Sequence, residues 1–276
     1  MTTPVPTPLH TTTGPWATAH VIPWDSEIFG FPVGCISLPT ESGPNLPPRD
    51  AAASLEAWAA NTAAVLVDVA VSANELTWHA WLEEAGFRCI DLALHVSLTS
   101  VKRRPKLLRS LEVREARGED HAAIIGIAGS SFDFGRYHRD PRFPRKLADR
   151  RFAVWVEKHL QAPGTGTRFF VAGPGGAPWA FMFCDVNKSA AAWNLGGVSR
   201  TSSNGLLGPM FFAGVLDALE AEGVKSIHSK ISAANTAVLN IYSALGFQTA
   251  SPQFVYHWHR NDAAILIPPP HTLSHP

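Results

Sequence analysis

The sequence predicts a mixed α/β or α+β fold, in which a mixed central sheet is flanked by helices. Short apolar or alternating segments of strand length are separated along the chain by longer segments with apolar residues at helical spacing. In addition, residues 72–87 align without gaps on residues 232–247, and each segment stands between two predicted strands. Few letters are identical, so the order strand, Ser-Ala, helix, Gly-Phe, strand is what indicates two copies of one fold.

Composition excludes several classes of protein. The 276 residues are 46% hydrophobic, enough for one large domain or two small ones. A formal net charge of +0 gives no reason to expect a nucleic-acid or anionic-membrane partner. The three cysteines are widely spaced and fit neither a disulfide framework nor a zinc pattern. With no signal peptide and no apolar run of about 20 residues, we expect a cytoplasmic protein without a membrane span.

The first region is expected to span residues 19–105, after a disordered Thr/Pro-rich tail at 1–18. Its elements are predicted from β-branched and aromatic runs, helical periodicity and glycine stops. They are strands and a tight turn over 20–37, helix 49–60, strand 65–71, helix 78–86 and strand 89–98. The basic segment 101–110 is expected to connect this region to the next.

The second region is expected to span residues 106–265, before a flexible tail at 266–276. Pro209 suits the first turn of one of its helices, and Gly223 suits the end of that helix. The predicted elements are a strand, turn and helix over 111–132, helix 148–160, strands 168–173, 177–186 and 190–199, helix 208–223, strand 224–232, helix 235–247 and strand 254–260.

Asn235 and Tyr242 mark the last predicted helix as a candidate site. Seven residues are close to two helical turns, so the two side chains share a face. A phenol with a pKa near about 10 stays protonated at neutral pH and can protonate a leaving group. The alternative is that Tyr242 is a core aromatic in an apolar stripe.

The motif NTAVLNIYSALGF at 235–247, the opening VREARGEDHAAI and the order of elements resemble the GCN5-related N-acetyltransferase superfamily. The resemblance covers roughly residues 110–260 and implies a tandem fold of this type, with a degenerate N-terminal copy. It also implies transfer of an acetyl group from acetyl-CoA to an amine by direct attack. Asn235 and Asn240 would then contact the cofactor and Tyr242 would protonate the CoA thiolate. Leu82 takes the place of Tyr242 in the first copy.

The resemblance further implies a cofactor site on a strand that splays from its neighbour and on the loop and helix start that follow. Helix starts bind phosphates through free backbone N–H groups. Ser203 and Leu206 depart from the superfamily's Arg/Gln-x-x-Gly-x-Gly/Ala loop, and the alternatives are a capped helix and an ordinary paired strand. The candidate residues are Leu195, Gly196, Gly197, Val198, Asn204, Gly205, Leu206, Leu207, Gly208 and Pro209.

The acceptor is predicted from two further stretches. HVIPWDSEIFGFPV at 20–33 and GRYHRDPRFP at 135–144 resemble sugar-nucleotide amine acetyltransferases, the group that includes dTDP-fucosamine acetyltransferase. Arginines with aromatic neighbours can hold a diphosphate and stack on a base. The alternative is a solvated basic loop. The candidate substrate-binding residues are Tyr137, His138, Arg139 and Arg142.

The general base is not identified, with Asp25, Glu27, His138 and Asp185 as candidates. His257 and His259 alternate on a strand, but with no third ligand apparent a metal site is rejected. The prediction is therefore an acetyl-CoA-dependent N-acetyltransferase for a small amine, such as a nucleotide-linked amino sugar. An acyltransferase for an amino acid, antibiotic or protein amine, and a non-catalytic CoA-binding protein with a decayed site, are the alternatives. The sequence does not decide the oligomeric state, and a homodimer is one possibility.

Overall fold

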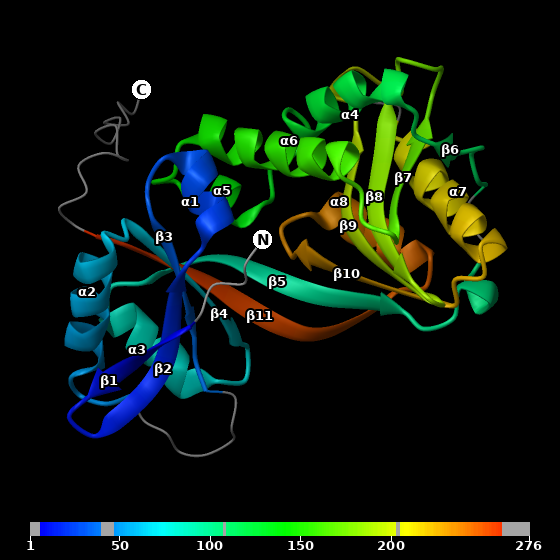
Figure 1. The fold of residues 1–276 in the computed structure, drawn as a ribbon. Coiled ribbons are helices and arrows are strands. Elements are labelled where there is room, and N and C mark those ends of the chain that lie inside the picture. The colour runs from blue at the N-terminus through cyan, green and yellow to red at the C-terminus, as the bar shows by residue number, and fades with distance from the viewer. Residues whose placement is uncertain (1–5, 40–46, 107–108, 203–204, 261–276) are drawn as a thin grey trace, which may run out of the picture. The chain divides into compact units, whose positions relative to one another are not determined.

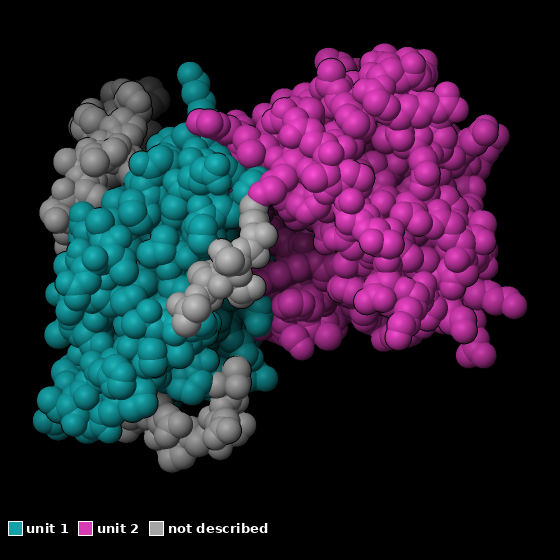
Figure 2. All heavy atoms as spheres, in the orientation of Figure 1, with its two compact units in different colours: residues 1–92, 136–148, 253–276 teal, residues 93–135, 149–252 magenta. Residues whose placement is uncertain are grey.

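The computed structural model describes residues 6–39, 47–106, 109–202 and 205–260. The chain forms two compact units, coloured separately in Figure 2. Unit 1 comprises residues 1–92, 136–148 and 253–276, and unit 2 comprises residues 93–135 and 149–252. Within the described ranges, no helix has both the length and the apolar character needed to cross a bilayer.

Unit 1 contains a sheet in the order β1-β2-β3-β4-β11. β3 and β4 are parallel, and the other neighbours are antiparallel (Figure 1). Its elements are β1 (Thr7–Thr11), β2 (Gly14–Val21), α1 (Pro23–Phe29), β3 (Val33–Ser37), α2 (Ala51–Thr62), β4 (Leu66–Ser72), α3 (Leu76–Glu84), α5 (Arg136–Arg139), the start of β5 (Arg88–Leu98) and the end of β11 (Gln248–His259).

Two predictions for the N-terminal residues are wrong. Residues 7–18 are not a disordered tail, because β1 and β2 form a hairpin there and bury Leu9 and Trp16 in the core of unit 1. The stretch 20–37 is not made only of strands and a turn, because α1 lies between β2 and β3. Pro23 occupies the first turn of this helix, where its missing N–H costs nothing, and Gly30 ends it with φ 78°.

Unit 2 contains a sheet in the order β5-β10-β9-β8-β7-β6, in which β9 and β10 are parallel. Its elements are the end of β5, η1 (Val101–Arg103), β6 (Arg114–Glu115), η2 (Gly118–Asp120), α4 (His121–Ala128), all but the first turn of α6 (Arg145–Gln161), β7 (Thr167–Ala172), β8 (Ala180–Asn187), β9 (Ala190–Val198), η3 (Arg200–Ser202), α7 (Leu207–Ala221), β10 (Ser226–Ser232), α8 (Thr236–Ala244) and the start of β11.

The internal repeat is present in the structure residue for residue. β4 aligns on β10, and α3 aligns on α8, with both ends of each pair at equivalent positions. Gly86 and Gly246 follow the two helices with φ values of 83° and 84°, a left-handed conformation that favours glycine. The prediction of two copies of one fold is thereby confirmed.

The two repeats exchange their final strands. Residues 253–259 of β11, from the second repeat, pair with β4 of the first. Residues 93–98 of β5, from the first repeat, pair with β10 of the second. The units therefore do not coincide with the expected ranges 19–105 and 106–265, and residues 136–148 also belong to unit 1. The predicted tail at 266–276 lies outside the described residues.

Each sheet is covered by helices that bury apolar stripes. In unit 1, α2 and α3 pack on β4 and β11 through residues such as Leu55, Trp58 and Leu82. In unit 2, α7 and α8 cover one face of the sheet, with Phe211 and Tyr242 in that core. α4 and α6 contribute to a separate cluster with β7 and β8 (Figure 1). β9 is therefore held between two packed layers.

Candidate active site

The candidate site of unit 2 begins where two parallel strands part. The ladder between β9 and β10 covers Ala190–Trp193, whereas the ladder between β9 and β8 continues to Val198. The register with β8 shifts at Asn194, which is the extra residue of a β-bulge. From Asn194 onward, the backbone N–H and C=O groups of β9 on the side toward β10 are therefore not part of the β9–β10 ladder.

A cavity of about 370 Å³ lies at this split. Its walls bring together many of the residues predicted to bind the cofactor. The predicted residues that line it are Leu195, Gly196, Gly197, Val198, Gly208, Asn235 and Tyr242. A Cβ atom on Gly197 would lie 3.0–3.1 Å from three side-chain atoms, those of Ile127, Phe132 and Phe181. Glycine at this position keeps the wall of the cavity close to the strand backbone.

Tyr242 lies in the wall of this cavity and is 6% exposed. Its hydroxyl donates to Ser229 Oγ at 3.2 Å, and that oxygen donates to the Trp193 carbonyl at 2.8 Å. The phenol therefore stands at the last pair of residues before the strands separate. Burial raises the pKa of Tyr242 to about 12, more than the Ser229 hydrogen bond lowers it, so the group is a proton donor at neutral pH.

Asn235 has a structural role at the same cavity. It is the N-cap of α8, and its side-chain oxygen accepts the Val238 N–H at 3.3 Å. Its amide nitrogen is the group left to meet a ligand. Asn240, on the same helix, is exposed and does not line the cavity.

The loop before α7 is only partly described, because Ser203 and Asn204 lie outside the described residues. α7 starts with Leu206 as N-cap, and the Leu206 side chain is 69% exposed and gives the helix no capping hydrogen bond. Gly208 lines the cavity, whereas Gly205, Leu206, Leu207 and Pro209 do not. The start of α7 therefore faces the cavity through backbone at Gly208.

Comparisons with known proteins agree with this geometry at the level of the fold. No protein-family model and no curated protein sequence matches the chain. A GCN5-related N-acetyltransferase from Sphaerobacter thermophilus superposes with a TM-score of 0.61 at 13% identity, covering 89% of this chain and 77% of that one. A tandem GNAT protein from the clavulanic acid biosynthesis pathway gives 0.53 at 13%, covering 91% and 81%. The chain has the fold of the GCN5-related N-acetyltransferases.

A third structure with this acetyltransferase fold is a glucosamine N-acetyltransferase region of a fungal multi-domain β-N-acetylglucosaminidase. It superposes with a TM-score of 0.61 at 11% identity, covering 90% of this chain and 32% of that one. Identities this low establish the fold alone.

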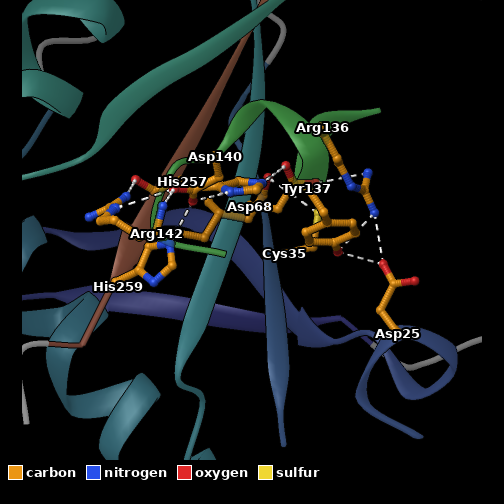
Figure 3. Close-up of polar contacts among 10 residues, drawn as sticks. Asp25, Cys35, Asp68, Arg136, Tyr137, Asp140, Arg142, His257 and His259 are labelled. Carbon is orange, nitrogen blue, oxygen red and sulfur yellow. Dashed lines mark hydrogen bonds and ion pairs between the residues drawn. The ribbon is translucent and has the colours of Figure 1, made fainter. Parts of the chain in front are cut away.

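The four residues predicted to bind the acceptor lie in unit 1, and two of them, Tyr137 and Arg142, belong to a cluster of polar side chains (Figure 3). Tyr137 is 2% exposed and donates to Asp25 Oδ2 at 2.6 Å. Arg136 forms ion pairs with Asp25 at 2.9 Å and with Asp68 at 3.1 Å. These contacts hold the start of the segment 136–148 against α1 and β4, so the loop is built into unit 1.

Asp140 is the centre of a second group in this cluster. Its Oδ2 accepts from His257 Nδ1 at 2.8 Å and from His259 Nε2 at 2.6 Å, and Arg142 Nε lies 3.4 Å from Oδ1. Burial would raise the pKa of Asp140, but the hydrogen bonds from the two histidines outweigh it and hold the pKa well below its usual range. His138 is half-buried and Arg139 is exposed.

From the sequence, a metal site was rejected because no third ligand was apparent beside His257 and His259. That premise is wrong, because Asp140 supplies a third donor. Donor atoms of Asp140, His257 and His259 lie within 4.8 Å of one another, the one such group found among the described residues. The separations of 2.6 and 2.8 Å are those of hydrogen bonds, and the Arg142 guanidinium adds positive charge. The arrangement as it stands ties the segment to β11.

Sequence reasoning missed the partners of Asp185. Its carboxylate accepts from Thr167 Oγ1 at 2.8 Å and from Asn194 Nδ2 at 2.7 Å, so it fixes the side chain of the bulge residue. Asn194 lines the cavity at the strand split. The sequence offered Asp185 as a candidate general base at a strand end. It did not indicate the contact with Asn194, because a bulge at Asn194 leaves no sequence signal of its own.

Proposed function

We propose that unit 2 is an acetyl-CoA-dependent N-acetyltransferase that acts on a small amine. The observation that carries the proposal is the cavity at the split between β9 and β10, with Tyr242 in its wall. Amide groups of a pantetheine arm can pair with the backbone of β9 beyond Trp193, as an added strand pairs with a sheet edge. The start of α7 at Gly208 offers backbone N–H groups and a helix dipole to the pyrophosphate.

The chemistry follows from the positions of the groups. The acceptor ammonium first loses a proton, and the amine lone pair then attacks the carbonyl carbon of the thioester. The C–N bond forms, the nitrogen loses a second proton to solvent, the C–S bond breaks, and CoA leaves as a thiolate that takes a proton from the Tyr242 hydroxyl. Overall, an ammonium and acetyl-CoA give the acetamide, CoA with a free thiol, and one proton. Tyr242 regains its proton from solvent.

Within this proposal the acceptor is a small amine, and a nucleotide-linked amino sugar is the first class to screen. The resemblance of residues 20–33 and 135–144 supports it, as does the fungal structure whose name includes glucosamine N-acetyltransferase. The engagement of Arg136 and Arg142 in ion pairs of unit 1 speaks against a diphosphate site on that loop.

A second candidate function, CoA binding without transfer, is favoured by the departures at Ser203 and Leu206. Two measurements separate the candidates. Calorimetry with acetyl-CoA should give saturable binding, and its absence at millimolar cofactor in folded protein would contradict both. Release of free thiol in the presence of nucleotide-linked amino sugars, amino acids or simple amines supports transfer. Binding with no thiol release across that screen would leave the non-catalytic function.

A further inference from the structure

A second cavity, of about 440 Å³, lies on β5, β9 and β10 of unit 2. It shares part of its wall with the cavity at the strand split. The residues that line both are Trp193, Asn194, Ser229 and Lys230. A molecule in the second cavity would therefore reach the point where the cofactor's acetyl group is expected under the proposed function, on which this inference rests.

The wall of the second cavity is basic. His228 and Lys230 are two residues apart on β10, so their side chains lie on the same face of the sheet. Lys230 stands opposite His95 on β5, and His228 stands opposite Ser97. The intervening Ser229 turns to the other face, where it meets Tyr242. None of the described residues that line this cavity is acidic.

His95, His228 and Lys230 all carry nitrogen donors on this wall. An anion that lies between His95, His228 and Lys230 would accept charge-assisted hydrogen bonds from them. The described residues of the same wall include no carboxylate that would favour a purely cationic amine. Charge therefore selects among acceptors at this cavity.

Asn194 presents a hydrogen-bond acceptor to this cavity, in contrast to the basic donors described above. A carboxylate only accepts hydrogen bonds, so the 2.7 Å contact with Asp185 Oδ2 requires the amide nitrogen of Asn194 to face Asp185. The amide oxygen is then the group that Asn194 presents elsewhere, at a position that lines both cavities. An amide oxygen accepts from an N–H, so an amine or ammonium suits this end of the cavity.

We propose that the acceptor is an amine that also carries an anionic group, a carboxylate or a phosphate. Its anionic group binds at His95, His228 and Lys230, and its amine lies at Asn194, next to the cofactor cavity. Asp185 is a positioning residue, because it acts through Asn194. The amine nitrogen attacks the thioester in the step described above, and the anionic group takes no part in bond changes.

The test uses pairs of probes that differ in charge, added to the full chain with acetyl-CoA. Glycine is paired with glycinamide, and O-phosphoethanolamine with ethanolamine, so that the two arms distinguish carboxylate from phosphate. The imidazole signals of His95 and His228 are followed by NMR, with assignment from His→Gln variants. We expect saturable shifts with the member of at least one pair that carries the anionic group, at about tenfold lower concentration than with the partner that lacks this group, equivalent to about 1.4 kcal/mol.

A matched pair of variants locates the effect. Lys230→Gln should weaken binding of the anionic probe by about tenfold to a hundredfold, as expected for loss of a hydrogen bond to a charged group. Lys225→Gln removes an equal charge at an exposed position that does not line the cavity, and it should leave the affinity unchanged. Acetyl-CoA affinity is measured in the same samples because Lys230 also lines the cofactor cavity, and in Lys230→Gln the loss of probe affinity should exceed any loss of acetyl-CoA affinity.

Several results would overturn the inference. They are equal affinity for the probes with and without the anionic group, no saturable shift with either anionic amine, and loss of acetyl-CoA binding rather than probe binding in Lys230→Gln. If acetyl-CoA itself does not bind, the proposed function fails. If acetyl-CoA binds and the anionic amines do not, only this inference fails.

Discussion

Tyr242 and Tyr256 are both buried tyrosines, but they lie in different units. They are 6% and 3% exposed, and burial raises the pKa of each to about 12. The Tyr242 hydroxyl bonds Ser229, and the Tyr256 hydroxyl bonds His79 Nδ1 at 3.0 Å. Only Tyr242 lines the cavity at the strand split. Comparing substitutions of the two tyrosines therefore distinguishes a catalytic role of Tyr242 from a packing role.

Tyr242→Phe should lower kcat by about 10²–10⁴-fold, because it removes a positioned general acid. Loss of one hydrogen bond should lower the free energy of unfolding by about 1 kcal/mol. Tyr256→Phe should cost similar stability and leave kcat unchanged. Steady-state kinetics and urea unfolding of both variants check this, and equal turnover by the two would assign Tyr242 to the core.

Asp120 gives a prediction about pH. Its carboxylate accepts from both terminal nitrogens of Arg114, at 2.7 and 2.9 Å, and from the Arg117 and Gly176 backbone N–H groups. The side-chain hydrogen bond from Arg114 is the largest cause that holds the pKa of Asp120 well below its usual range, against the effect of burial. The stabilisation is therefore complete above the unfolded carboxyl pKa of about 3.9 and is lost as pH falls through the lower folded pKa.

Asp120→Asn should lower the free energy of unfolding by about 1–3 kcal/mol at neutral pH. The difference from the unmodified protein should shrink as pH falls below about 4. Glu119→Gln, at an exposed neighbouring position, is the control and should change stability little. Denaturant unfolding from pH 7 to pH 3 gives the comparison. A difference that stays constant with pH would show that the charge of Asp120 is not what stabilises this turn.

At the scale of single elements, two helix glycines differ in what a side chain would meet. In α7, a Cβ on Gly214 would lie 2.1 Å from the Leu111 carbonyl oxygen, a backbone atom that cannot rotate away. In α4, a Cβ on Gly126 would meet nothing within 4 Å. Gly214 therefore allows the segment before β6 to run against α7, whereas Gly126 has no such role.

Gly214→Ala should destabilise the protein by about 1–3 kcal/mol, because α7 must shift away from Leu111. Gly126→Ala should instead be stabilising by up to about 1 kcal/mol, from helix propensity alone. Thermal unfolding of both variants tests the pair. If the Gly214→Ala substitution displaces α7, it should also weaken acetyl-CoA binding, because the first turn of α7 lines the cofactor cavity.

The sequence predicted elements whose signals are local. The helices at 76–84 and 236–244 carry apolar periodicity and glycine stops, and both were placed within a few residues. β1 and β2 were missed because Thr and Pro were taken as signs of disorder, whereas Leu9 and Trp16 gain their burial from residues far along the chain. Asp140 was missed as a partner of His257 because they are 117 positions apart.

At the scale of the whole molecule, the exchange of β5 and β11 makes each unit depend on both repeats. Unit 2 without β5 would lose Val96 and Leu98 from its core and leave β10 with an open edge. A fragment of residues 106–276 should therefore neither unfold cooperatively nor bind acetyl-CoA. A fragment of residues 1–105 lacks β11 and should also fail to fold.

Mixing the two fragments should restore one cooperative transition and acetyl-CoA binding, in a ratio of one cofactor per pair of fragments. That stoichiometry also checks the expectation that the first repeat, with Leu82 in place of the tyrosine, binds no cofactor of its own. Circular dichroism and calorimetry give both readings. Full acetyl-CoA affinity in the 106–276 fragment alone would contradict the dependence.

The exchanged strands also set an order in time on the ribosome. β4 is synthesised before the 180 residues 73–252, and the part of β11 that pairs with it follows them. At about 5–20 residues per second, the apolar strand with Val67, Val69 and Val71 waits roughly 10–40 s with one edge open. An open apolar edge can pair with another chain. Nascent chains of this protein are therefore expected to need a chaperone until translation has passed residue 259.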